Sequence, residues 1–151
     1  MSVHEDKAKE FFLEGYNCSQ AVFLAFSDEL GIDQETALRL SSSFGGGMGR
    51  LREVCGAVSG MFMAAGVKYG YSDPKASDEK KEHYARIQKL AEEFREENGS
   101  IVCRELLGLK QKQDSPVPEE RTSEYYKKRP CVKMVGDAAR ILEAYIQSNE
   151  E

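Results

Sequence analysis

Residues 15–31, GYNCSQAVFLAFSDELG, contain a complete set of helix signals between two glycines. Asn17 is a favoured N-cap residue, and Gln20, three residues later, completes the pattern of a capping box. Apolar residues then recur at helical spacing along one face, and Gly31 supplies the stop. The stretch therefore predicts a helix over residues 18–30.

The same pattern of caps, periodic apolar residues and stops recurs along the rest of the chain, and no segment alternates as a β-strand would. The predicted helices cover about residues 3–14, 18–30, 34–43, 54–68, 78–97, 100–107 and 130–147. Residues 109–122 predict a connection, and residues 115–120, with two prolines and several charges, are expected to be exposed and comparatively mobile. We therefore expect an all-α fold: a compact single-domain helical bundle of about five to seven helices over residues 1–151, with no sheet beyond a trivial pair.

Length and composition narrow the classes of function. A chain of 151 residues is long enough to bury a core without disulfides, and a net charge of −5 argues against a general nucleic-acid binder. No stretch approaches the roughly 18 apolar residues of a membrane span, and the charged, amphipathic amino terminus lacks the features of a signal peptide. We expect a cytoplasmic protein that binds neither nucleic acid nor membrane. In that reducing compartment, cysteines are more often catalytic or metal-binding than permanently bridged.

Four isolated cysteines lie where the sequence signals the start of a helix. Cys18 follows the Asn17 cap, and the other three follow a glycine-rich stretch, a Ser cap and a proline; they are Cys55, Cys103 and Cys131. A helix amino terminus carries about half a positive charge and unpaired N–H donors, so all four thiols are expected to be biased toward thiolate. Thiolates suit a metal, a cluster or reactive thiol chemistry. The alternative interpretation is that the cysteines simply fill a helical core.

Two glycine-rich segments stand close together in the sequence and break ordinary helix propensity. The first supplies a flexible backbone with four glycines in five residues, and the second places two glycines four apart inside a predicted helix; they are Gly45, Gly46, Gly47 and Gly49, then Gly56 and Gly60. The spacing matches neither a dinucleotide-binding loop nor a Walker loop. We take the six glycines as candidate cofactor-binding residues. Close packing of another helix against Gly56 and Gly60 is the alternative.

Charged residues near the cysteines are weaker candidates. Four arginines lie within a few residues of a cysteine, namely Arg50, Arg52, Arg104 and Arg129. Guanidinium groups there would offset clustered thiolates or receive an anionic substrate, and ordinary surface charge is the alternative. The chain has only two histidines, His4 and His83, which are few for a histidine-based catalytic or zinc centre.

The order of these segments is distinctive: GYNCSQAV, FGGGMGRLREVCGAVSG, VCRELLG and PCVKMVGDAARIL. The chain resembles the family of redox-active proteins named C_GCAxxG_C_C for its spaced cysteines, over about residues 11–146. The family name writes Gly before Cys in the central motif, whereas this chain has Cys55-Gly56-Ala57, which we take as the same element. The resemblance nominates the four cysteines as the functional set and implies redox or metal chemistry. It supplies no substrate.

Three hypotheses for function follow. The leading one is a redox protein whose four thiolates, Cys18, Cys55, Cys103 and Cys131, hold an iron–sulfur cluster for electron transfer, with [2Fe–2S] preferred. Zinc is less favoured, because the long intervals between the cysteines do not suit a compact zinc site. The second is a thiol–disulfide oxidoreductase in which the cysteines are themselves the redox groups, and it predicts paired rather than fourfold proximity. The third is a helical interaction module with core cysteines. We expect at least three sulfurs to lie close together; the redox partner protein and the oligomeric state stay open.

Overall fold

The computed structural model describes residues 2–109 and 114–150 and is all-α, as predicted. Helices follow in the order α1 (Val3–Leu13), α2 (Cys18–Ser27), α3 (Gln34–Ser41), η1 (Ser42–Phe44), α4 (Gly45–Met48), α5 (Gly56–Tyr69), α6 (Ser77–Asn98), α7 (Cys103–Leu106), α8 (Ser123–Lys128) and α9 (Cys131–Asn149). Over the described ranges, extended pairing is limited to one isolated antiparallel bridge between Val54 and Val102. This bridge is the trivial pair that the sequence allowed.

The number of helices exceeds the predicted five to seven because of short segments. One of them, α8, lies in a stretch for which the sequence predicted no helix, although Thr122 caps it by accepting a hydrogen bond from the Tyr125 N–H. Another, α4, is not a regular helix, because Gly46 and Gly47 inside it have positive φ angles. The predicted long helices all form, with ends shifted by a few residues.

The predicted capping box fixes the start of α2. The Asn17 side chain accepts from the Gln20 N–H at 2.9 Å, and the Gln20 side chain accepts from the Asn17 N–H at 3.1 Å. These reciprocal bonds satisfy two donors that a helix start leaves open. Cys18 is therefore held as the first residue of α2.

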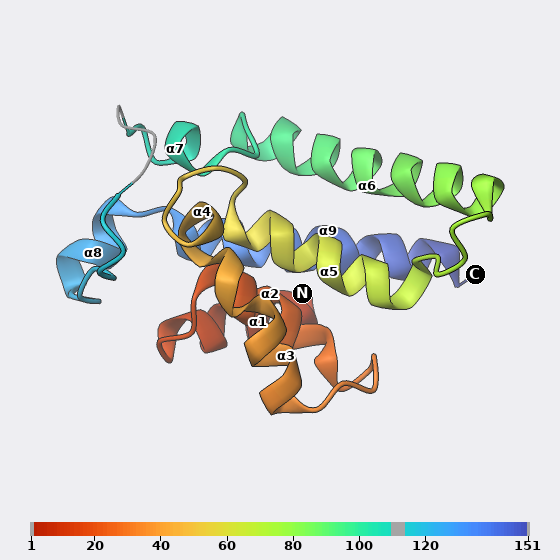
Figure 1. Ribbon diagram of the computed structural model, residues 1–151. Helices are drawn as coiled ribbons and strands as arrows, with labels where there is room; N and C mark the ends of the chain where they lie inside the picture. Colours follow the sequence, from red (N-terminus) through yellow and green to blue (C-terminus); the bar gives the residue numbers. More distant parts are fainter. Residues whose placement is uncertain (1, 110–113, 151) are drawn as a thin grey trace.

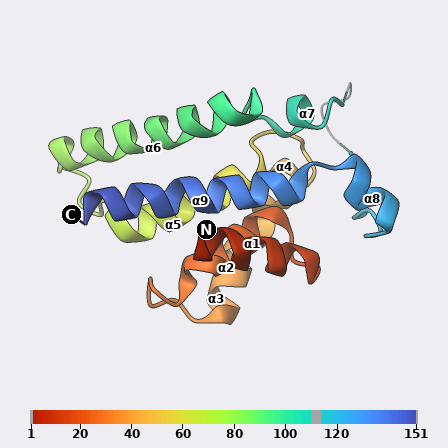
Figure 2. The same ribbon diagram turned by 180° about the vertical axis from the view of Figure 1, so that it is seen from behind.

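The long helices pack in layers around α5 and α9, which run side by side through the centre of the molecule (Figure 1). Helix α6 lies along one flank of this pair, and α1 to α3 lie along the other, as the reverse view also shows (Figure 2). The largest fully buried side chains come from α1, α2, α5, α6 and α9 and include Phe12, Phe23, Phe26, Met61, Leu90, Phe94 and Leu142. The short helices α4, α7 and α8 gather at the end where α5 and α9 begin.

A glycine brings α2 and α5 into close contact. A Cβ atom on Gly60 would lie 2.7 Å from the Ser19 carbonyl oxygen and 3.0 Å from the Val22 Cβ, which is too close for any side chain. The helix-packing interpretation therefore explains Gly60. As a result, Cys18 at the start of α2 comes near the start of α5.

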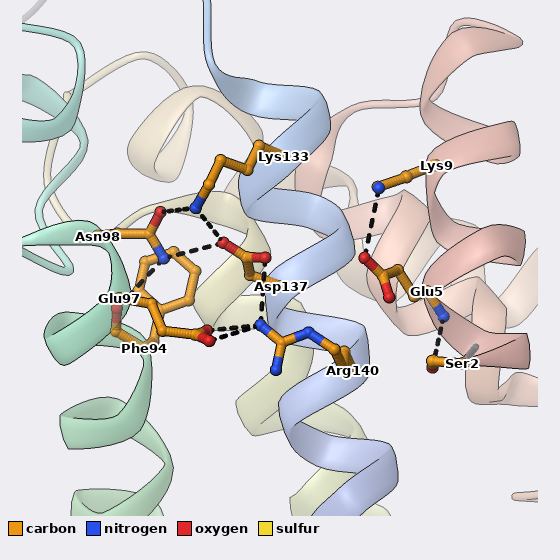
Figure 3. Close-up of polar contacts among 9 residues, drawn as sticks. All are labelled: Ser2, Glu5, Lys9, Phe94, Glu97, Asn98, Lys133, Asp137 and Arg140. Carbon is orange, nitrogen blue, oxygen red and sulfur yellow. Dashed lines mark hydrogen bonds and ion pairs between the residues drawn. The ribbon is translucent and has the colours of Figure 1, made fainter.

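A polar network joins α9 to α6 (Figure 3). Asp137, 8% exposed, accepts from Lys133 at 2.6 Å, from Arg140 at 3.3 Å and from Asn98 of α6 at 3.3 Å. Burial alone would raise the pKa of Asp137, but the hydrogen bonds from Lys133 and Arg140 outweigh burial and hold the pKa below its usual value of 3.8. The network anchors the helix that carries Cys131 at its first position.

The connection before α8 is exposed, as predicted, over residues 115–120. The part of the predicted connection at residues 110–113 lies outside the described residues, and the expected mobility of the linker stays a prediction. Within the described part of the chain, no helix combines the length and the apolar character needed to cross a membrane.

Candidate functional site

All four cysteines stand at helix starts, as the sequence predicted. Cys18, Cys103 and Cys131 are the first residues of their helices. Cys55 is the N-cap residue of α5. Although they come from four separate segments, all four line a single cavity of about 270 Å³. Many of its lining residues come from the short helices α4, α7 and α8 and from the starts of α2, α5 and α9. The short helices lie at the end of the molecule where α5 and α9 begin (Figure 1).

Cys18 and Cys131 form a pair within this cavity. Their side chains are hydrogen-bonded to each other, and this contact raises the pKa of Cys18 well above 9.0. The same hydrogen bond, with the positive charges of Arg129, Arg121 and Arg52, lowers the pKa of Cys131 to about 7. Both residues are partly exposed free thiols. The pair therefore combines one thiolate near neutral pH with one neutral thiol beside it.

The other two cysteines are buried. Burial raises the pKa of Cys55 to about 12, although the nearby backbone N–H groups of Ala57 and Val58 oppose the rise. Burial also raises the pKa of Cys103, whose sulfur accepts a hydrogen bond from Arg52 Nη1 at 3.5 Å. The expectation that all four thiols are biased toward thiolate is therefore wrong for three of them. For Cys55 and Cys103, the cost of desolvating the thiolate outweighs the stabilisation that a helix amino terminus gives to it. For Cys18, the hydrogen bond with Cys131 is the largest cause that keeps the thiol protonated.

The first glycine segment adopts a left-handed turn. Residues 46–50 all have positive φ, with values of 68°, 72°, 70°, 64° and 68°. Met48 and Arg50 are not glycines, and each costs roughly 1–2 kcal/mol in this conformation. The turn is held by backbone hydrogen bonds from Gly49 to Gly45 at 2.9 Å and from Glu53 to Gly47 at 3.0 Å. Strain of this kind is typical of functional sites and ligand clamps.

Two of the candidate glycines, one in the turn and one at the start of α5, pack closely against cysteine side chains. A Cβ on Gly47 would lie 2.6 Å from the Cys103 Cβ, and a Cβ on Gly56 would lie 3.1 Å from the Cys18 Cβ. Five of the six candidate glycines line the cavity, namely Gly45, Gly46, Gly47, Gly49 and Gly56. Gly60 is not among the lining residues and contacts α2 instead. Small residues here let the four cysteine-bearing segments approach each other.

Three of the four arginines noted in the sequence also line the cavity. Arg52, 5% exposed, bridges Cys103 and Asp114, whose carboxylate it reaches at 2.7 and 2.8 Å. Arg50 donates to the Ser115 carbonyl at 2.7 Å, and Arg129 pairs with Glu119. Arg104 instead pairs with Glu53 at 3.2 Å outside the lining.

Sequence reasoning missed Arg121 and Tyr125, which also line the cavity. Arg121 donates to the carbonyls of Phe12 at 2.7 Å and Tyr16 at 2.8 Å, and its guanidinium lies 4.2 Å from the Phe12 ring centroid. Burial, followed by the nearby Cys131 and Cys18 sulfurs, raises the pKa of Tyr125. Both residues fall in or beside the stretch interpreted as a connection. The Thr122 cap was the one signal that a structured turn begins there.

The arrangement offers thiol chemistry directly. In the described part of the chain, no group of three or more His, Cys, Asp and Glu side chains is placed to hold a metal ion. A thiolate with a neighbouring thiol can attack a disulfide and then be resolved. The guanidinium groups around the pair stabilise negative sulfur.

The comparison with protein families agrees with this chemistry. A family model described as "Putative redox-active protein (C_GCAxxG_C_C)" matches residues 16–145, so the chain belongs to this family. All four cysteines lie within the matched range. A search of curated proteins and a search of solved structures each found no match.

Proposed function

We propose that the protein is a thiol–disulfide redox protein in which Cys131 is the attacking thiolate and Cys18 is the resolving thiol. The observation that carries this proposal is that Cys18 and Cys131 line one cavity, where the interaction of the two side chains lowers the pKa of Cys131 to about 7 and raises that of Cys18. The optimal attacking thiol has a pKa near the ambient pH, because a lower pKa costs nucleophilicity and a higher one leaves too little thiolate. Cys131 meets that condition near neutral pH.

The proposed reaction uses an external disulfide as the oxidant. The Cys131 thiolate attacks one sulfur of the disulfide, the external S–S bond breaks, and the first thiolate leaves and takes up a proton from solvent. Cys18 then gives up its proton and attacks the Cys131 sulfur, which breaks the mixed disulfide and releases the second thiolate. Starting from the Cys131 thiolate, the protein loses two electrons and the one proton of Cys18, solvent supplies the other proton, and the external disulfide becomes two thiols. The reverse reaction oxidises an external thiol pair.

The surrounding residues support this chemistry. Arg129 and Arg121 stabilise the Cys131 thiolate, and Tyr125 stays protonated beside the pair because its pKa is raised by burial. Cys55 and Cys103 are 5% and 7% exposed and remain neutral thiols at pH 7. Cys131 is therefore the sulfur expected to attack the external disulfide first.

The test is to trap the intermediate in reduced protein treated with a small disulfide at pH 7. Cys18→Ser should accumulate a mixed disulfide at Cys131, detected by mass spectrometry, because the resolving thiol is missing. Cys131→Ser should form mixed disulfides much more slowly than Cys18→Ser does, and the wild type should end with a Cys18–Cys131 disulfide. Oxidation that joins any other pair first, or mixed disulfides spread over all four cysteines, would refute the assignment.

A second candidate function is electron transfer through an iron–sulfur cluster, and one observation favours it. Four cysteines line one cavity, a guanidinium donates to the Cys103 sulfur, and backbone N–H groups favour the anionic form of Cys55, as is usual around cluster sulfurs. The donor set thus fits the chemistry of a cluster, whereas no single-ion site is found among the described residues. Cys18, Cys55, Cys103 and Cys131 would hold the cluster, which would supply one-electron transfer.

Cys55→Ser separates the two candidates. A cluster protein purified without oxygen should contain iron and acid-labile sulfide and absorb in the visible range, and Cys55→Ser should abolish all three signals with modest loss of stability. A thiol–disulfide protein should lack these signals, and its Cys55→Ser variant should still form the Cys18–Cys131 disulfide. A folded Cys55→Ser variant with unchanged iron content would remove Cys55 from a cluster site.

A further inference from the structure

The cavity around the cysteine pair has an excess of positive charge. Among the described residues, four guanidinium groups line it, from Arg50, Arg52, Arg121 and Arg129. The carboxylates that pair with them are Asp114, shared by Arg50 and Arg52, and Glu119, which pairs with Arg129. Among these described groups two positive charges therefore remain, of which one thiolate at Cys131 offsets one.

Arg50 and Arg52 share one carboxylate, which leaves one of the two remaining charges there, and Arg121 carries the other. Its described hydrogen bonds go to two carbonyl oxygens, of Phe12 and Tyr16, and its ring contacts are with Phe12 and Tyr125. No carboxylate pairs with it in the described part of the chain. Carbonyl groups and rings orient a guanidinium without neutralising it. The group is thus fixed in place with its net charge available to a ligand.

The position of Arg121 links this charge to the reactive sulfur. Arg121 lies close enough to Cys131 to lower its pKa, and both residues line the cavity. The cavity volume of about 270 Å³ lies just below the roughly 300–1,000 Å³ of small-molecule sites. A small molecule, rather than a folded protein domain, fits such a space.

We propose that the cavity selects small disulfides and thiols that carry carboxylate groups, and that Arg121 is the residue that determines this selectivity. The inference rests on the thiol–disulfide function proposed above and names the substrate class. A carboxylate of the substrate pairs with Arg121 while the Cys131 thiolate attacks the substrate disulfide. One S–S bond breaks and one forms, and the leaving carboxylate-bearing thiolate departs into the same cationic surroundings and then takes up a proton.

The net charge of the whole protein acts against a preference for anionic substrates. The chain has a net charge of −5, so its overall field repels anions and attracts cations. A preference for anionic disulfides would therefore have to arise locally, from the residues around the cavity. Added salt should reduce this preference, because salt screens interactions between partly exposed charges.

The experiment compares three small disulfides of similar size at pH 7 and low salt: 3,3′-dithiodipropionate (anionic), 2-hydroxyethyl disulfide (neutral) and cystamine (cationic). The readout is the rate of mixed-disulfide formation at Cys131 in the Cys18→Ser background. We expect the anionic disulfide to react at least about tenfold faster than the cationic one, as expected for steering into a charged cleft. Rates are normalised to the same reaction with free cysteine, which removes intrinsic differences between the disulfides.

The variant Arg121→Gln keeps hydrogen-bond donors for Phe12 and Tyr16 but removes the charge. Its Cys131 becomes less acidic, which slows all three reactions, so the ratio of anionic to cationic rates is the informative quantity. That ratio should fall at least about fivefold in Arg121→Gln and be restored by Arg121→Lys. Arg39→Gln is the matched control, because Arg39 is 80% exposed and pairs with Glu35 away from the cavity. The same change in net charge there should leave the ratio within about twofold.

A binding measurement adds a readout that involves no disulfide exchange. Suberate has the same chain length as 3,3′-dithiodipropionate but no sulfur, and it should slow alkylation of Cys131 by iodoacetamide in the wild type. The neutral 1,8-octanediol should not. Suberate should lose this effect in Arg121→Gln, with folding of the variant verified by circular dichroism.

The possible outcomes separate the two proposals. Exchange that is equally fast with all three disulfides, or a ratio that Arg121→Gln leaves unchanged, overturns the substrate class and leaves the thiol–disulfide function standing. Failure of every disulfide to react at Cys131 overturns both. A high ratio that falls in Arg121→Gln, together with protection by suberate, supports the inference.

Discussion

Replacing Cys18 with alanine should remove most of the thiolate character of Cys131 at neutral pH. The largest cause of the low pKa of Cys131, about 7, is its hydrogen bond with Cys18. Hydrogen bonds to charged groups contribute about 1.5–3 kcal/mol, and each 1.36 kcal/mol changes a protonation equilibrium about tenfold. Cys131 is about half ionised at pH 7 in the wild type. In Cys18→Ala, the ionised fraction should fall below about one tenth.

Absorbance at 240 nm measures this fraction directly, because thiolates absorb there and thiols do not. The structure makes the assay selective, since the pKa values of Cys18, Cys55 and Cys103 are all raised above 9.0. Between about pH 5 and 8.5, the signal should therefore come from Cys131 alone, and Cys131→Ser should abolish it.

Serine at position 18 provides the matched variant. A serine hydroxyl also donates a hydrogen bond, so Cys18→Ser should keep part of the effect, whereas Cys18→Ala keeps only the Cβ that packs near Gly56. If the 240 nm midpoint is the same in wild type, Cys18→Ala and Cys18→Ser, the hydrogen bond does not set the acidity of Cys131. The Arg129 and Arg121 charges would then have to account for it.

Further predictions concern the redox pair, the α9 network and the strained turn. Reduction of a Cys18–Cys131 disulfide takes up two protons below about pH 7 and one proton above it, because the pKa of Cys131 is about 7. The slope of the reduction potential against pH should therefore change from about −59 to about −30 mV per pH unit near that pKa. A glutathione redox titration at several pH values measures this slope. Asp137→Asn should lower the free energy of unfolding by about 1–3 kcal/mol at pH 7 in urea titrations, because it weakens the hydrogen bonds with Lys133 and Arg140. The depressed pKa of Asp137 stabilises the fold above its unfolded value, and this contribution is lost as pH falls through the folded value, so the difference between Asp137→Asn and wild type should shrink below about pH 3.8. Gly47→Ala should destabilise the fold more than Gly49→Ala, because both residues have positive φ but only the Gly47 Cβ would meet Cys103, at 2.6 Å; Gly49→Ala should cost about 1–2 kcal/mol, and equal losses for the two variants in thermal unfolding would contradict the close packing of the turn.

The sequence predicted those features of the fold that depend on neighbouring residues in the chain, such as helix caps and helical periodicity. The capping box at Asn17 and Gln20 and the helical periodicity predicted α2 close to its observed bounds, and the same signals located the four cysteines at helix starts. Unlike those of Met48 and Arg50, the positive φ angles of Gly46, Gly47 and Gly49 also follow from local composition. Such features need no knowledge of the rest of the fold.

Tertiary properties of the site could not be predicted in this way. Helix starts were expected to lower the pKa of every thiol, but burial decides the result for Cys55 and Cys103, and burial depends on which helices pack together. The pairing of Cys18 with Cys131 joins segments 113 residues apart. Arg121 was missed because a single arginine in a polar stretch has no local signal of its contact with Phe12 and Tyr16.

The arrangement of the cysteines limits the cavity to one negative sulfur. Each additional thiolate would be repelled by the first, and the Cys131 charge opposes ionisation of Cys18, Cys55 and Cys103. Oxidation of Cys18 and Cys131 to a disulfide removes that one charge, so the excess positive charge around Arg121 is larger in the oxidised state than in the reduced state. An anionic ligand that does not react should therefore bind the oxidised protein more tightly, and by linkage it should favour oxidation of the pair. In this cavity, the redox state of the cysteines and the affinity for anions are thus two aspects of the same electrostatic balance.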